Sequence, residues 1–62
     1  MKVRIKSFNG ELPEYLTLGK EYEVIGGNMP YLDIVGDNGL PVLLDINDCG
    51  HLNDGTWEVI DE

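Results

Sequence analysis

The stretch YLDIVGDNGLPVLLD, residues 31–45, decides the fold, because it contains two short runs of strand-forming residues on either side of a turn. The runs are residues 31–35 and 42–44, and the intervening GDNG predicts a hairpin, since asparagine and glycine tolerate the positive φ of a tight turn. A slip of one residue in such a pair exchanges its two faces. The length of the turn therefore determines which side chains are buried.

Two turn lengths are compatible with this stretch. A two-residue turn at Asn38 and Gly39 places a charged side chain, Asp33, among apolar ones. A three-residue loop, residues 37–39 with Gly39 in the left-handed conformation, instead creates one wholly apolar face, formed by Leu32, Ile34, Val42 and Leu44. We favour the three-residue loop, which leaves on the opposite face Tyr31, Asp33, Val35, Leu43 and Asp45.

Alternation of apolar and polar residues predicts three further strands, at residues 2–8, 20–25 and 56–60. Residues 9–19 and 26–30 are expected to be loops, and residues 46–53 a turn or a single helical turn. Five short strands with these spacings favour a small barrel, because closure hides sheet edges. We expect one all-β domain over residues 1–62, a five-stranded SH3-like barrel with a short helical turn before the last strand. The main alternative, an OB-fold, usually needs a helix where this sequence has the tight turn.

The composition limits where the protein works. Cys49 is the single cysteine, which excludes an intrachain disulfide and is compatible with a reducing cytoplasm. The first residues alternate in polarity, unlike a signal peptide, and no window approaches the roughly 20 apolar residues of a membrane span. We therefore expect a cytoplasmic protein with no membrane association.

The charge is strongly negative, with 12 acidic and 4 basic residues and a net charge of −8. Such a surface repels phosphate backbones, so we expect no direct contact with nucleic acid. Three of the bases, Lys2, Arg4 and Lys6, form a stripe on the first predicted strand. If this strand pairs with the last one, the stripe lies opposite Glu58 and either Asp61 or Glu62, where cross-strand pairs of opposite charge are stabilising.

Three segments together resemble a group of very small SH3-like barrel proteins encoded in bacteriophage and prophage genomes. They are LTLGKEYEVIG at 16–26, YLDIVGDNGLPVLL at 31–44 and WEVIDE at 57–62. They match a T-x-G-K-x-Y-x-V entry, a D-x-G hairpin and a terminal strand of the form aromatic-E-x-hydrophobic. The resemblance implies a fold and a setting inside a bacterial host, without implying an activity. The aromatic cluster, tryptophan pair and P-S-N-Y motif of eukaryotic SH3 domains are absent, so their polyproline groove is not carried over.

For the residues that could take part in catalysis or metal binding, a structural role is favoured over a chemical one. Cys49 and His51 lack the further ligands of a zinc site and the third group of a nucleophile–base–orienter set, so we expect a buried thiol and a surface imidazole. Asp45, Asn47 and Asp48 lack the spacing of a calcium loop and are expected to bond their own backbone. We predict no catalytic residue, metal or cofactor.

The candidate binding residues are Tyr31, Val35 and Leu43, with Asp33 and Asp45 as an acidic rim. On the outer face of the hairpin they form an exposed apolar cluster edged by charge, which is typical of contact sites. Alternatively, these side chains pack under the first long loop, around Leu12 or Leu16.

The sequence thus favours a non-enzymatic phage or prophage accessory protein that binds a bacterial or phage protein. The partner is expected to carry a basic patch, because complementary charge speeds encounter. Homodimerisation through the same face is also open. The alternative function is that of an acidic DNA mimic, which inhibits a host enzyme by occupying its nucleic-acid groove.

Overall fold

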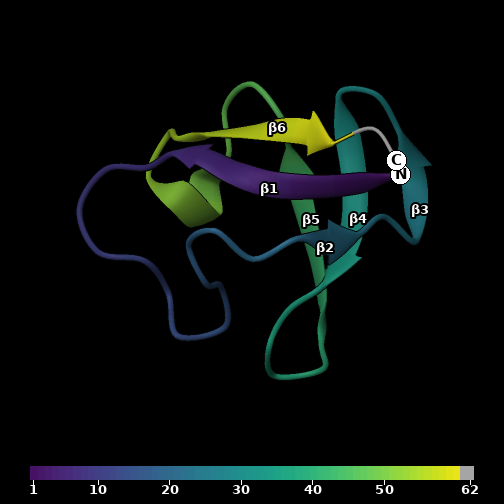
Figure 1. The fold of residues 1–62 in the computed structure, drawn as a ribbon. Helices are drawn as coiled ribbons and strands as arrows, with labels where there is room; N and C mark the ends of the chain where they lie inside the picture. The colour runs from purple at the N-terminus through teal and green to yellow at the C-terminus, as the bar shows by residue number, and fades with distance from the viewer. Residues whose placement is uncertain (61–62) are drawn as a thin grey trace.

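The computed structural model describes residues 1–60 as a β protein with one 3-10 turn (Figure 1). The elements are β1 (Lys2–Ser7), β2 (Tyr22–Glu23), β3 (Gly26–Asn28), β4 (Tyr31–Val35), β5 (Pro41–Asp45), η1 (Gly50–Leu52) and β6 (Thr56–Ile60). The all-β prediction is confirmed, as is the helical turn before the last strand.

The strands form two three-stranded antiparallel sheets, ordered β2-β1-β6 and β3-β4-β5. Residues 22–28 run from one sheet to the other (Figure 1): the Val24 N–H donates to the Met1 carbonyl, and the Ile25 N–H donates to the Asp33 carbonyl. Neither sheet closes into a barrel, so the expected five-stranded SH3-like barrel is not confirmed.

The prediction of a loop over residues 26–30 is wrong, because residues 26–28 pair with β4. Gly27 makes this possible, since it has φ of +91° and a Cβ there would lie 2.4 Å from the Tyr31 carbonyl oxygen. Only glycine combines that backbone conformation with so close an approach. The connection between β3 and β4 therefore consists of Met29 and Pro30, which are joined by a cis peptide bond.

The three-residue turn predicted for the hairpin of β4 and β5 is confirmed. Asp33 lies opposite Leu43, and the Gly36 N–H donates to the Leu40 carbonyl across a loop of residues 37–39. Gly39 has φ of +81°, as this loop requires. The inner face consists of four buried side chains, Leu32, Ile34, Val42 and Leu44.

The core combines these residues with side chains of the other sheet and of the loops. Tyr22 and Trp57 meet edge to face, with ring centroids 5.9 Å apart. The remaining buried hydrophobic residues are Val3, Ile5, Leu16, Ile46, Cys49 and Leu52. Most lie at alternate strand positions, as expected for sheets with one buried face.

Arg4, the central residue of the basic stripe on β1, faces an acid of β6, as predicted. Arg4 lies opposite Glu58 on β6, and both its Nε and its Nη2 are 2.6 Å from Glu58 Oε1. Lys2 Nζ lies 3.9 Å from Glu21. The other acids proposed for this contact, Asp61 and Glu62, lie outside the described residues.

A polar cluster around Asp37 attaches the long loop of residues 8–21 to the hairpin turn. The Asp37 carboxylate accepts hydrogen bonds from Thr17 Oγ1 at 2.6 Å, from Lys20 Nζ at 2.5 Å and from the Tyr22 hydroxyl at 3.1 Å. The Asp37 N–H donates to the Tyr15 carbonyl at 2.8 Å. The Lys20 ammonium, followed by Thr17, lowers the pKa of Asp37.

Truncation of Leu44 tests the register of the hairpin. Leu44 is 2% exposed and its neighbour Leu43 is 69% exposed. We expect Leu44→Ala to lower the free energy of unfolding by roughly 2–5 kcal/mol. The matched Leu43→Ala should change it by about 0.5 kcal/mol or less, since the side chain is in water. Urea unfolding measures both, and equal losses would contradict the register.

Replacement of Asp37 by asparagine tests the polar cluster. Because the pKa of Asp37 is lowered in the folded state, its contribution to stability is complete above the unfolded value and is lost as the pH falls through the folded value. We expect Asp37→Asn to lower the melting temperature at pH 7 and to have a smaller effect at acidic pH, below the unfolded value of the Asp37 pKa. Glu11→Gln, an exposed acid of the same loop, is the control and should have little effect at either pH.

Candidate functional site

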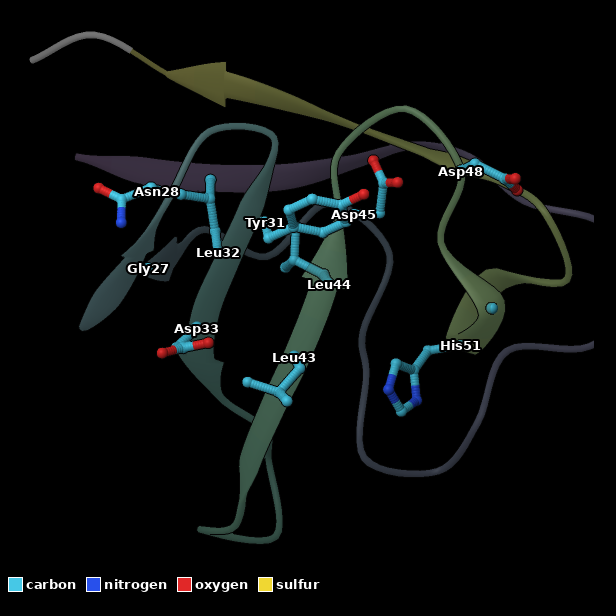
Figure 2. Close-up of a pocket in the computed structure, with 11 residues that line it drawn as sticks. Gly27, Asn28, Tyr31, Leu32, Asp33, Leu43, Leu44, Asp45, Asp48 and His51 are labelled. Atoms are coloured by element: carbon cyan, nitrogen blue, oxygen red, sulfur yellow. The ribbon is translucent and has the colours of Figure 1, made fainter.

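A surface groove lies along the outer face of β4 and β5, where it continues onto the segment that follows β5 (Figure 2). Its volume is about 860 Å³. Strands β3, β4 and β5 form one side, and residues 48–51 form the other. We call this feature the β5 groove and define it by Tyr31, Asp33, Leu43, Asp45, Asp48 and His51.

The apolar part of the β5 groove consists of the side chains predicted to point outward. Tyr31 is 65% exposed and Leu43 is 69% exposed, and both project from the outer face of the sheet (Figure 2). Val35 is exposed on the same face nearer the hairpin turn, but it does not line the groove. The alternative packing under the long loop is wrong, because Leu16 is in the core while Tyr31 and Leu43 are in solvent.

The charged part of the groove consists of Asp33, Asp45 and Asp48. The first two were predicted as a rim, and the structure adds the third. Within residues 1–60, the ion pairs engage Lys2, Arg4 and Lys20 with other acids. The acids of the groove therefore form a negative surface next to exposed apolar side chains.

Asp48 also lies close to Asp54. A hydrogen bond to Asp54, followed by repulsion from its charge, raises the pKa of Asp48, and burial and Asp45 add to the effect. Both Asn53 and Asp54 have positive φ, which turns the chain after η1 and brings Asp54 toward Asp48. The sequence contains no sign of this pair, because it depends on an unusual backbone conformation of two non-glycine residues.

The structure confirms the prediction for Cys49 but not the one for His51. Cys49 is buried, as predicted. His51 was expected at the surface, yet it is half-buried and its Nδ1 lies 2.6 Å from the Tyr15 hydroxyl. Their rings meet edge to face at 5.7 Å. His51 thus joins the long loop to the wall of the groove.

The turn after β5 behaves as predicted, since Asp45 Oδ1 accepts a hydrogen bond from the Asn47 N–H at 3.0 Å. Among residues 1–60, no group of three or more His, Cys, Asp and Glu side chains is placed to hold a metal ion. In the same part of the chain, no helix has the length and apolar character needed to cross a membrane.

Comparison with known proteins gives no match: no protein-family model, curated protein or solved structure is similar to the chain.

Neutralisation of Asp48 tests the electrostatics of the groove. A raised pKa in the folded state means that ionisation of Asp48 destabilises the fold as the pH rises through that value. We expect Asp48→Asn to raise the melting temperature at pH 7 and to have no such effect near about pH 2–3, where the carboxyl is protonated in both states. Asp54→Asn removes the charge that raises the pKa of Asp48, so it should also raise the melting temperature at pH 7. A lower melting temperature at pH 7 for both variants would contradict the repulsion.

Proposed function

We propose that the protein binds another protein through the β5 groove and performs no chemistry. The observation that carries the proposal is the joint presence, on one concave surface, of two large exposed apolar side chains and three carboxylates. Tyr31 and Leu43 supply the apolar contact. Their burial against a partner is favourable at roughly 25 cal/mol per Å² of apolar surface removed from water.

The carboxylates define the chemistry of the partner. Asp33, Asp45 and Asp48 favour a basic segment, since complementary charge speeds association and fixes its register. Tyr31 also suits the centre of such a contact, because tyrosine is enriched among the residues that contribute most of the binding energy at interfaces. The partner surface is therefore expected to offer apolar side chains flanked by lysine or arginine.

We also propose that the two sheets have an SH3-like arrangement. Three features support an SH3-like arrangement. Residues 22–28 are shared by both sheets, the backbone N–H of Trp57 donates to the Ile46 carbonyl between β6 and the end of β5, and η1 precedes the last strand. The setting, a phage or prophage accessory protein in the cytoplasm of a bacterial host, rests on the sequence resemblance alone.

The alternative role as a DNA mimic is supported by the net charge of −8. The groove favours the protein-binding role instead, because its acids lie beside Tyr31 and Leu43, whereas a mimic needs carboxylates at phosphate-like spacing. The two roles differ in their response to salt. A mimic should lose affinity steeply as salt rises, and binding through Tyr31 and Leu43 with an acidic rim should weaken less.

Leu43→Asp tests the proposed function by placing a charge at the centre of the groove. The control is Leu18→Asp, which changes another exposed leucine, 56% exposed, that does not line the groove. Immobilised wild-type protein and both variants are incubated with bacterial lysate at low and high salt. We expect a protein retained by the wild type and by Leu18→Asp, at both salt concentrations, to be lost from Leu43→Asp. Equal retention by all three proteins would refute a role for the groove.

A further inference from the structure

We infer that the partner supplies an extended peptide segment that adds to the free edge of β5 as a further strand, with an apolar and a basic side chain two residues apart. This inference rests on the proposed function and specifies the ligand of the same groove. It follows from the backbone of β5, from the position of the groove and from the order of side chains along the edge.

The backbone of β5 is available because β5 is the last strand of its sheet, with β4 as its only neighbour among the described residues. The bonds from Gly36 N–H to the Leu40 carbonyl and from Ile46 N–H to the Pro30 carbonyl fix the alternation of the ladder. Pairs along an antiparallel ladder are alternately hydrogen-bonded and non-hydrogen-bonded. The backbone groups of Val42 and Leu44 therefore bond to β4, whereas Leu43 is in a non-hydrogen-bonded pair with Asp33. The N–H and carbonyl of Leu43 therefore point away from the sheet.

The neighbours of Leu43 on the strand define how far this edge extends. Pro41 and Asp45 are also in non-hydrogen-bonded pairs with β4. The Pro41 carbonyl and the Asp45 N–H therefore point outward as well. The Asp45 carbonyl accepts the Asp48 N–H at 3.3 Å, which ends the free edge. No hydrogen bond within residues 1–60 engages the Leu43 N–H or carbonyl outside the ladder. An added strand would bond to these outward groups, as peptides do at open sheet edges.

The β5 groove lies beside this edge. It is lined by residues of β3, β4 and β5 on the sheet and by Asp48, Gly50 and His51 beyond β5, so it extends across the edge where an added strand would lie (Figure 2). Most small proteins protect an exposed edge with charge, proline or a covering loop. Here Pro41 protects only the first position, and Leu43 in the middle of the strand stays 69% exposed.

The side chains of β5 predict the pattern of the ligand. On the outer face Leu43 is followed two residues later by Asp45, because side chains alternate along a strand. A ligand residue paired with Leu43 lies on the same face beside it and is expected to be apolar. The ligand residue next to Asp45 lies two positions away, faces Asp45 and Asp48, and is expected to be lysine or arginine.

Charge argues against a second copy of this chain as the added strand. Antiparallel pairing of two β5 strands around Leu43 places Pro41 of each copy, which has no N–H, opposite Asp45 of the other. It also brings together two chains of net charge −8 with their acidic grooves adjacent. A basic segment from another protein meets neither obstacle.

The test begins with selection from a random library of peptides of about ten residues, long enough to cover a strand of the usual length. Immobilised full-length protein is the bait, and the Leu43→Asp protein is the matched negative bait. We expect peptides enriched on the wild type to share an apolar residue and a lysine or arginine two positions apart. Three results would overturn the inference: enrichment of acidic peptides, enrichment of peptides whose apolar residues recur three or four positions apart as in a helix, or enrichment of the same peptides on both baits.

Amide hydrogen exchange with an enriched peptide then locates the contact. In the free protein the amides of Leu43 and Asp45 should exchange faster than those of Val42 and Leu44, which bond to β4. Addition of a strand should slow exchange at Leu43 and Asp45 by about tenfold or more. The measurement uses the wild-type protein, so it does not depend on the folding of a variant.

The outcomes separate this inference from the proposed function. If binding is lost in Leu43→Asp but the exchange of Leu43 and Asp45 amides is unchanged by peptide, strand addition is wrong and the groove still binds. If the lysate experiment shows no dependence on Leu43, the proposed function fails as well. Protection of the Leu43 amide in the protein alone, increasing with protein concentration, would overturn the inference in favour of a second copy.

Discussion

The register of the β4–β5 hairpin is the constraint on which the rest of this structure depends. Gly39 at φ of +81° allows a loop of three residues, and the Asn38 carboxamide oxygen accepts the Leu40 N–H at 3.0 Å. With this loop, Leu44 faces the core and Leu43 faces solvent. A loop shorter by one residue would exchange the faces of one strand relative to the other. The core and the groove are therefore two consequences of the same turn.

The same turn also explains why the groove is negative. Asp37, the first residue of the loop, engages Lys20, the single base after residue 6. The other bases belong to β1, where Arg4 pairs with Glu58 in the opposite sheet. Because Lys2, Arg4 and Lys20 pair with other acids within residues 1–60, the charges of Asp33, Asp45 and Asp48 remain in the groove. The negative charge of the groove therefore results from the small number of basic residues and from their positions away from it.

The sequence predicted what local pattern controls, and it missed what distant contacts control. The hairpin, its loop and the buried strand faces follow from alternation and from Gly39, which act over a few neighbouring residues. His51 was misplaced because its environment is set by Tyr15, 36 positions away. The strand at residues 26–28 was missed because glycine and asparagine lower strand propensity, whereas pairing with β4 overrides it. The acidic pair of Asp48 and Asp54 had no local sign at all.

The groove is also the region where this small fold departs most from what stability alone favours. A chain of 62 residues has a small core, and domains of this size retain only about 3–5 kcal/mol of stability. Yet it leaves Tyr31 and Leu43 in water and places Asp48 where its ionisation is unfavourable. Departures of this kind are expected at functional sites, where binding rather than folding determines the residues. Under the proposed function, one event would relieve both the repulsion among the carboxylates and the exposure of the apolar side chains: the binding of a segment that is both basic and apolar. The two features are therefore better explained together, as the two halves of one recognition surface, than separately as solubility and chance exposure.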